Sequence, residues 1–419
     1  MGSSENRLQA IGCRPKAKGR KSFWFPIAYS LKPKAFFVMS FSLYIHIPYC
    51  LVKCPYCDFN VYAAKQWPEE HYIDALCAEF RLYITQTPWT GQALETIYFG
   101  GGTPSLFAPA AIERFLNFVA DHCSLVANAE ISLEADPASV SYEKLAGYRA
   151  IGVNRLSFGV QSFQAPVLKT LGRLHTVDDA LNSLSWVRNA GFSNVSLDLI
   201  FAVPGQTLDM VADDVSQAVV HAPTHLSTYC LTYEERTPFF SMRKKGKLLA
   251  VSEDEEVEMY ALVQERSKGA GYSHYEISSF AQPEFRSRHN SNYWQGVNYL
   301  GLGAGAHSYA SEPDWGKRWS NERSPRRYMD RALTNGDTAS EEETLTREQA
   351  MGEFMFLNLR QLSGFYPQAF VERFGVDLHA TFPQVGTLIT DGLLTQEDGK
   401  IKLSERGLFL ADSVFASFF

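Results

Sequence analysis

The chain has 419 residues, of which 45% are hydrophobic, and a formal net charge of −7. This length suffices for one large domain and a smaller one, and the negative charge argues against a nucleic-acid-binding protein, which would present a basic face. No uninterrupted apolar run approaches the roughly 20 residues that span a bilayer, so the sequence predicts no transmembrane segment.

Residues 1–39 form a basic extension at the start of the chain. Residues 1–38 contain eight Lys or Arg and one acidic residue, so this segment carries +7 and the remainder −14. Pro26 and Lys32 interrupt the apolar core that a secretory signal needs. An organellar targeting peptide is one interpretation. We favour a disordered extension or a start assigned upstream of the true one, because Met39 immediately precedes the first clear strand.

From residue 42 onward, segments with strand and helix patterns alternate. Apolar, β-rich runs predict six strands, at residues 42–49, 95–101, 130–136, 154–162, 194–203 and 225–233. Helical spacing occurs between them, for example at residues 69–84, 109–123 and 177–191, the last of which closes on a glycine C-cap. This alternation indicates βαβ units and a parallel sheet.

Unusual polar and glycine-rich residues lie towards the carboxyl ends of all six predicted strands. In chain order these are the cysteines after the first strand, residues 100–105, Glu134, Gln161, Asp198, and Thr232 with Glu234. In a TIM-type barrel the catalytic residues gather at this end. We therefore predict an α/β fold with a partial (β/α)6 TIM-type barrel over residues 40–310 and one active-site face. A doubly wound sheet is the alternative.

The regular alternation fades after about residue 271. Residues 287–310 are rich in Asn, Gly and aromatic residues and are predicted as loop and short strand near a site. Residues 311–419 are predicted as a mainly helical domain that ends in a helix, a hairpin turning at Asp398 and Gly399, and another helix. That order is typical of a winged-helix module. The charges of this segment are balanced, which favours a packing or lid role over DNA binding.

Seven cysteines stand at positions 13, 50, 54, 57, 77, 123 and 230. Their odd number and the absence of a disulfide-like framework fit a reducing compartment, so we expect a cytoplasmic protein. Cys50, Cys54 and Cys57 are spaced as metal ligands. A zinc site would need a second ligand pair further along the chain, and none is visible. The C-x3-C-x2-C spacing after the first strand instead matches the signature of radical S-adenosylmethionine (SAM) proteins.

Two further motifs stand at the ends of the second and third predicted strands. "GGGTPS" (100–105) reads as a turn with Thr103 as N-cap and Pro104 as the first helical residue, and its glycines would also admit a ligand close to the backbone. In "SLEADP", Glu134 could hold a hydroxyl or an ammonium group, whereas Asp136 reads as a structural N-cap. Without a family resemblance, Gln161, Arg173 and Asp198 would be unremarkable.

The stretch "RHNSNYW" (288–294) combines a histidine with two aromatic residues. One interpretation is a hydrogen-bonded histidine over an aromatic cluster, and the other is a surface for a flat, metal-containing ligand with His289 as an axial donor. "GLGAGAHS" (301–308) lacks the G-x-G-x-x-G spacing and does not begin a βαβ unit, so it does not indicate a dinucleotide site.

From about residue 42 to its end, the chain resembles the coproporphyrinogen III oxidase-like branch of the radical SAM superfamily, and within it the heme chaperones. The resemblance rests on "LYIHIPYC", "CPYCDF", "YFGGGTPS", "RLSFGVQSF", "DLIFAVPGQT", "SRHNSNYW" and "YLGLGAGAHS". It implies that Cys50, Cys54 and Cys57 hold a [4Fe–4S] cluster whose fourth iron is open to SAM. An electron from such a cluster cleaves SAM to a 5′-deoxyadenosyl radical.

The resemblance also implies roles for residues around the cluster. Tyr44, Gly101 and Glu134 match positions that contact the cluster-bound SAM. A second group matches positions that lie around SAM or a second SAM molecule in the authentic oxidase, namely Tyr56, Gly102, Thr103, Gln161, Arg173, Asp198 and Thr232.

Two departures from the oxidase decide which activity the resemblance implies. The oxidase has a fourth cysteine two residues after the third, where this chain has Phe59, and residues 1–39 do not resemble the oxidase's amino-terminal arm. We therefore expect a chaperone that binds heme and passes it to acceptor proteins, which could be membrane-associated. The alternatives are oxidative decarboxylation of coproporphyrinogen III and a radical SAM reaction on another substrate.

Overall fold

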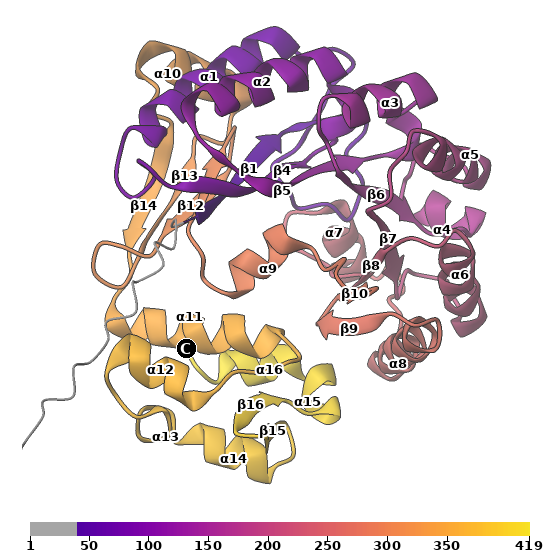
Figure 1. The fold of residues 1–419 in the computed structure, drawn as a ribbon. Coiled ribbons are helices and arrows are strands. Elements are labelled where there is room, and N and C mark those ends of the chain that lie inside the picture. The colour runs from indigo at the N-terminus through magenta and orange to yellow at the C-terminus, as the bar shows by residue number, and fades with distance from the viewer. Residues whose placement is uncertain (1–39) are drawn as a thin grey trace, which may run out of the picture. The chain divides into compact units, whose positions relative to one another are not determined.

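The computed structural model describes residues 40–419, so the predictions for residues 1–39 lie outside the described part. The central feature is a 12-stranded sheet in the order β14-β13-β12-β11-β1-β4-β5-β6-β7-β8-β10-β9 (Figure 1). Its middle contains the six predicted strands, all parallel: β1 (Ser40–Ile47), β4 (Ala93–Gly101), β5 (Leu125–Ala135), β6 (Arg155–Gln161), β7 (Val195–Phe201) and β8 (His225–Cys230).

Helices cover the outer face of this curved sheet (Figure 1). They are α1 (Glu69–Ile84), α2 (Pro109–His122), α3 (Tyr142–Ala150), α4 (Ala165–Thr170), α5 (Val177–Asn189), α6 (Leu208–Val220) and α8 (Glu253–Gly269). The short helix α7 (Pro238–Lys244) lies instead beside the cysteine loop, where the Phe239 amide donates to the Pro55 carbonyl. Successive strand residues point to opposite faces. Leu43 and Ile45 of β1 therefore join the apolar core, while Ser42 and Tyr44 face the barrel interior. The predicted partial (β/α)6 barrel is confirmed.

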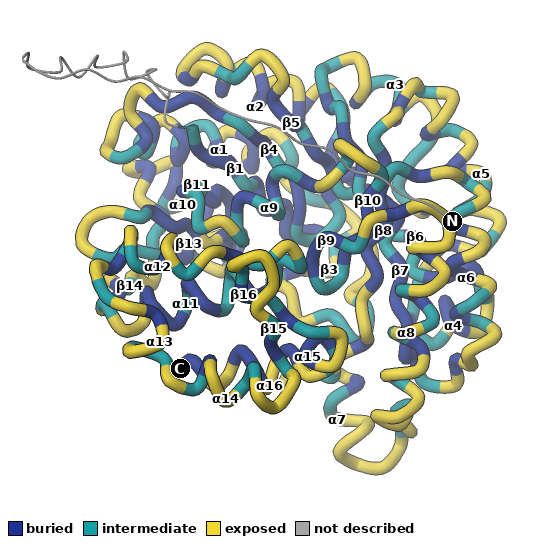
Figure 2. Tube along the Cα trace, turned by 60° about the horizontal axis from the view of Figure 1, so that its bottom comes forward, coloured by how far each residue is buried: buried dark blue, intermediate teal, exposed yellow. Residues whose placement is uncertain are grey.

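Local capping explains why the predicted helices begin and end where they do. At α5, the Thr176 hydroxyl accepts a hydrogen bond from the Asp179 amide, and the Asp179 carboxylate accepts one from the Thr176 amide. Gly191 follows the helix with a φ of +84°, as the predicted glycine cap requires. In Figure 2, exposed and buried residues alternate along the helices, whereas the strands are mostly buried.

The sheet continues past the six parallel strands on both sides. β11 (Tyr299–Leu302) pairs in parallel with β1, followed by antiparallel β12 (His307–Ala310), β13 (Lys317–Asn321) and β14 (Ala339–Thr344). At the other edge lie β10 (Ser279–Ala281) and β9 (Ser273–Glu276). β13, β14 and the helix α10 (Pro325–Asn335) between them extend this sheet. The domain boundary at residue 310 stays a prediction.

The prediction for residues 287–310 was wrong in one part. "RHNSNYW" is not a loop but the helix α9 (Arg288–Trp294). The Ser287 hydroxyl caps it by accepting from the Asn290 amide, and both oxygens of Glu130 accept from the amides of Arg288 and His289. These acceptors satisfy amides that a short helix leaves unpaired. The rest of the stretch forms β11, a turn and β12, as predicted, and this antiparallel hairpin rules out a dinucleotide-binding βα turn.

A second hydrophobic core organises the C-terminal residues. Its elements are α11 (Arg347–Arg360), α12 (Pro367–Phe374), α13 (Leu378–Thr381), α14 (Gln384–Thr390), β15 (Leu394–Glu397), β16 (Lys400–Leu403), α15 (Glu405–Phe409) and α16 (Ala411–Ala416). The predicted helix–hairpin–helix order is confirmed. The hairpin turns at Asp398 and Gly399, both with positive φ, which suits a two-residue turn.

Candidate active site at the carboxyl ends of the strands

The three predicted ligand cysteines lie in the loop that leaves β1. Two short strands, β2 (Tyr49–Cys50) and β3 (Tyr62–Ala63), pair to hold the base of this loop. All three thiols are half-buried and line one cavity of about 1420 Å³, which we call the cysteine cavity. Burial raises the pKa of the Cys50 thiol to about 11 and also raises that of Cys57.

Two side chains donate hydrogen bonds to these sulfur atoms. The Thr103 hydroxyl lies 3.5 Å from Cys50 Sγ, and Arg173 Nη1 lies 3.7 Å from Cys54 Sγ. Such donors favour the thiolate form that binds iron. Within residues 40–419 no group of three His, Cys, Asp or Glu side chains is placed to hold a single metal ion. Three thiols around one open cavity suit a multi-iron cluster that leaves one side accessible.

The glycine run approaches the cysteine loop so closely that side chains would not fit. A Cβ atom on Gly101 would lie 2.5 Å from the His46 ring, and one on Gly102 would lie 2.6 Å from the Tyr49 carbonyl oxygen. The amides of Gly102 and Thr103 donate to the carbonyls of Ile47 and Tyr49. Thr103 and Pro104 take the predicted N-cap and first positions of the short helix η1 (Pro104–Leu106).

Gly102→Ala is expected to lower the free energy of unfolding by about 1–3 kcal/mol, because the added methyl group overpacks a backbone that cannot yield. Urea denaturation followed by circular dichroism measures this change. Gly269→Ala is the matched control, since no atom lies within 4 Å of a Cβ there. Equal stability of the two variants would show that the loop can move away.

Glu134, at the end of β5, faces the barrel interior between two donors. Its carboxylate accepts from the Tyr98 hydroxyl at 2.9 Å and from the Gly101 amide at 3.0 Å. Burial raises its pKa to about 7, and the nearby Asp198 adds to this effect. Burial also raises the pKa of Asp198 to about 6, although the hydroxyl groups of Ser157 and Ser196 donate to its carboxylate. Two buried carboxyl groups with raised pKa values are typical of a functional site.

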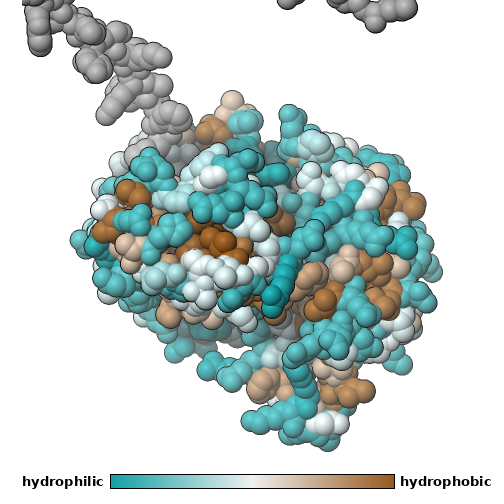
Figure 3. Space-filling model, turned by 90° about the horizontal axis from the view of Figure 1, so that it is seen from below, coloured by the Kyte–Doolittle hydropathy of each residue, from teal (hydrophilic) through white to brown (hydrophobic). Residues whose placement is uncertain are grey.

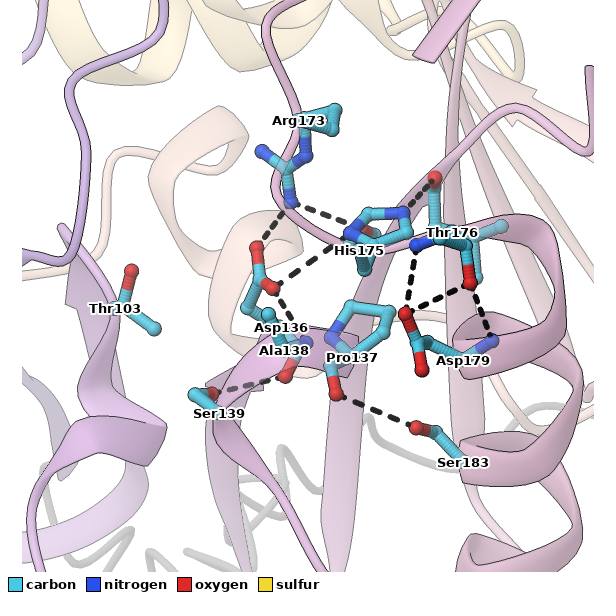
Figure 4. A network of polar contacts seen from close by, with 12 residues as sticks. Thr103, Asp136, Pro137, Ala138, Ser139, Arg173, His175, Thr176, Asp179 and Ser183 are labelled. Carbon is cyan, nitrogen blue, oxygen red and sulfur yellow. Dashed lines mark hydrogen bonds and ion pairs between the residues drawn. The ribbon is translucent and has the colours of Figure 1, made fainter. Parts of the chain in front are cut away.

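Asp136 is a site residue that the sequence interpretation missed. It is the predicted N-cap, accepting from the Ala138 amide at 2.8 Å, at the start of the short helix η2 (Pro137–Ser139). Its other oxygen forms an ion pair with Arg173, and His175 lies 3.7 Å away (Figure 4). Arg173 also donates to the Gly159 carbonyl. Asp136 therefore fixes the guanidinium that reaches the Cys54 sulfur.

The remaining predicted contacts share the same cavity. Tyr56, Gln161 and Thr232 line it together with Gly101, Gly102, Thr103, Glu134, Arg173 and Asp198. Gln161 adopts a φ of +67°, which non-glycine residues rarely do outside functional sites. Thr232 lies just after β8 rather than at its end. Tyr44 is the exception, because it lines a neighbouring cavity that shares Gly101 and Glu134 with the first.

We call this neighbouring space, of about 950 Å³, the aromatic cavity. It lies beside β11, β12, β13 and α11, and its aromatic walls comprise Tyr44, Phe59, Tyr293, Trp294, Tyr299, Tyr309, Phe356 and Phe419. Phe59 is 63% exposed and lines both cavities. Phe59 thus stands at the boundary between them.

His289, the predicted candidate for an axial ligand, is fully engaged inside the barrel. Its Nδ1 atom lies 2.7 Å from the Thr96 hydroxyl and its Nε2 atom 2.8 Å from the Tyr293 hydroxyl. The ring stacks on Tyr98 with 5.0 Å between centroids. Burial lowers its pKa to about 3, so the ring is neutral. This geometry agrees with the hydrogen-bonded alternative and leaves neither nitrogen for a metal.

Within residues 40–419 no helix is long and apolar enough to cross a membrane. The face drawn in Figure 3 is mostly hydrophilic, with hydrophobic residues in separate patches.

Comparison with known proteins places the site in a family context. Residues 44–218 match the family model of the radical SAM superfamily, and residues 345–410 match that of the HemN C-terminal domain. The heme chaperone HemW of Bacillus subtilis is 36% identical over 380 residues, which cover 90% of this chain and 98% of that protein. HemW of Escherichia coli is 34% identical over 90% of this chain and 97% of its own length.

A solved structure also shares the fold. Coproporphyrinogen III oxidase (HemN) from Escherichia coli, described as a radical SAM enzyme, superposes with a TM-score of 0.78 at 24% identity. The match covers 91% of this chain and 90% of the oxidase.

Proposed function

Because the chain belongs to the heme chaperone HemW family within the radical SAM superfamily, we propose that it binds heme and transfers it to acceptor proteins. Family membership implies a [4Fe–4S] cluster and SAM as cofactors. Cys50, Cys54 and Cys57 would hold the cluster, and the open side of the cysteine cavity would take SAM. The bound cluster would supply a low-potential electron and an open iron position.

The observation that carries this proposal is the position of Phe59. It occupies the place of the oxidase's fourth cysteine and lines both cavities, and it adds an apolar, exposed ring beside the three thiols. A flat apolar ligand gains from aromatic surface of this kind. Two carboxylates complete the polar side of the site. Glu134 orients a bound ammonium or hydroxyl group, and Asp136 holds Arg173 in place.

A heme titration of the purified full-length protein tests the proposal. We expect a saturable shift of the Soret band with a stoichiometry near one heme per chain. Anaerobic incubation of the reconstituted protein with coproporphyrinogen III, SAM and a reductant is the companion assay, in which we expect no protoporphyrinogen IX. Absence of saturable heme binding would contradict the chaperone proposal, and product formation would instead support the oxidase alternative.

The pH dependence of SAM binding tests the role of Glu134. Below a pKa of about 7 its carboxyl group is neutral, and above that value it is a carboxylate that attracts an ammonium group. We therefore expect the affinity of the reconstituted protein for SAM to rise as the pH increases from about 6 to about 8. Isothermal titration calorimetry measures it, with Glu134→Gln as the control that loses this rise. The same rise in the variant would assign the titration to another group.

The cellular setting remains part of the proposal. We expect heme acceptors that could be membrane-associated, and a cytoplasmic protein that meets them peripherally.

A further inference from the structure

The aromatic cavity has the size and walls of a site for a flat ligand. Its volume of about 950 Å³ lies within the range of small-molecule and cofactor pockets, roughly 300–1,000 Å³. Tyr293 and Tyr299 meet edge to face at 4.5 Å between centroids, and Tyr299 lies 6.2 Å from Tyr309. These contacts hold the rings of one wall in fixed positions.

Two of the chain's ten histidines, His46 and His307, line the aromatic cavity, and none lines the cysteine cavity. Both ring nitrogens of His46 have partners, namely the Tyr44 hydroxyl and the Asn60 carbonyl, each at 3.0 Å. His307, the first residue of β12, has an exposed side chain, and among residues 40–419 neither of its ring nitrogens has a hydrogen-bond partner. His307 is therefore the histidine of this cavity that can donate a lone pair to a ligand.

The surroundings of His307 suit an iron ligand. Loss of hydration on the protein side of the ring lowers the pKa of His307, and the positive charge of Arg323 lowers it further, while Glu341 acts in the opposite direction. The imidazole is therefore neutral at neutral pH, which is the form that coordinates iron.

Arg323 offers a cation for an acidic group of the same ligand. Its guanidinium forms no ion pair with any residue between positions 40 and 419. The other two arginines of the cavity are engaged, because Arg318 pairs with Glu343 and Glu353 and Arg327 pairs with Glu322. A guanidinium matches the geometry of a carboxylate such as a porphyrin propionate.

We propose that heme binds in the aromatic cavity with its iron on His307 and a propionate on Arg323. This assignment rests on the proposed chaperone function. It adds the binding site and names His307, in place of His289, as the axial ligand. The binding step forms an iron–nitrogen bond and an ion pair and changes no oxidation state.

Absorption spectroscopy of the full-length protein titrated with ferric heme tests the assignment. His307→Ala is expected to lose the spectrum of an imidazole-ligated heme and to bind about tenfold or more weakly, and added imidazole should restore the spectrum. Arg323→Gln should keep the spectrum and weaken binding. His379→Ala is the control, because His379 is exposed and lines neither cavity.

The outcomes separate the assignment from the function on which it rests. Saturable heme binding by the unchanged protein, with the same spectrum and affinity in His307→Ala, would overturn the assignment and leave the chaperone proposal standing. No binding by the unchanged protein would overturn both. If His307→Ala does not fold, His307→Cys tests the same assignment. It is expected to convert the spectrum to that of a thiolate-ligated heme, and an unchanged imidazole spectrum would refute the assignment.

Discussion

Replacing Cys50, Cys54 or Cys57 singly by alanine is expected to abolish the thiolate-to-iron absorbance of the anaerobically reconstituted protein. Three protein thiolates leave one iron open, so a cluster held by only two thiolates would have a second iron without a protein ligand. The three side chains line one cavity, and Asp136 in its wall is already paired with Arg173.

The measurement combines iron content per chain with the absorbance and the electron paramagnetic resonance spectrum after reduction. Cys77→Ala is the matched control, because Cys77 is also half-buried but lies on α1 and outside the cysteine cavity. It should retain the iron and the spectrum of the unchanged protein. A single variant at position 50, 54 or 57 with full iron content would show that the three-ligand model is wrong.

Glu79→Ala is expected to lower the free energy of unfolding by about 3–5 kcal/mol, the largest stability effect that we predict. Glu79 is fully buried on α1. Its oxygens accept from the Gly303 amide at 3.0 Å and from the side chains of Asn321, Tyr328 and Thr338 at 2.5–2.6 Å. Asn321 and Thr338 have other acceptors, but alanine would leave the Gly303 amide and the Tyr328 hydroxyl buried without one.

Chemical denaturation at neutral pH measures this loss. Glu265→Ala is the control, since that side chain is exposed on α8 and should change stability by about 0.5 kcal/mol or less. A small effect of Glu79→Ala would indicate that water enters the space and satisfies the donors.

Glu79 also predicts a pH dependence with a definite sign. Burial raises its pKa in the folded chain to about 7, from about 4.5 for an unperturbed group. The folded state then holds the proton more tightly than the unfolded state. The stabilisation is fully present below pH 4.5 and is lost as the pH rises through 7. Relative to Glu79→Gln, the unchanged protein should therefore lose stability over this interval, as denaturation at several pH values would show.

The local sequence sufficed to predict the barrel and the side of it that carries the site. Alternating apolar patterns and caps at Thr176 and Gly191 act within a few residues, so they are visible without the fold. Because parallel strands align their carboxyl ends, Glu134, Gln161 and Asp198 could be placed on one face before their contacts were known.

Long-range contacts set the limits of that prediction. "RHNSNYW" looks like a loop by composition, and it becomes a helix because Glu130, 158 positions earlier, accepts from its first amides. Asp136 reads as an N-cap because that contact is local, whereas its ion pair with Arg173 is 37 positions away. His289 looked available because the partners that occupy its nitrogens include Thr96, which lies in a distant strand.

The pairing of β1 with β11 has a consequence for synthesis on the ribosome. Ser42 of β1 accepts from Asn292, which is 250 positions further along the chain. The wall of the cysteine cavity is also completed late, because it includes Ile277 and Leu408. A growing chain therefore presents its three thiols to oxidants before that wall is complete, and thiols exposed in this way are open to oxidation. Shielding of the nascent loop, or early delivery of iron to it, would therefore protect these thiols during synthesis in air.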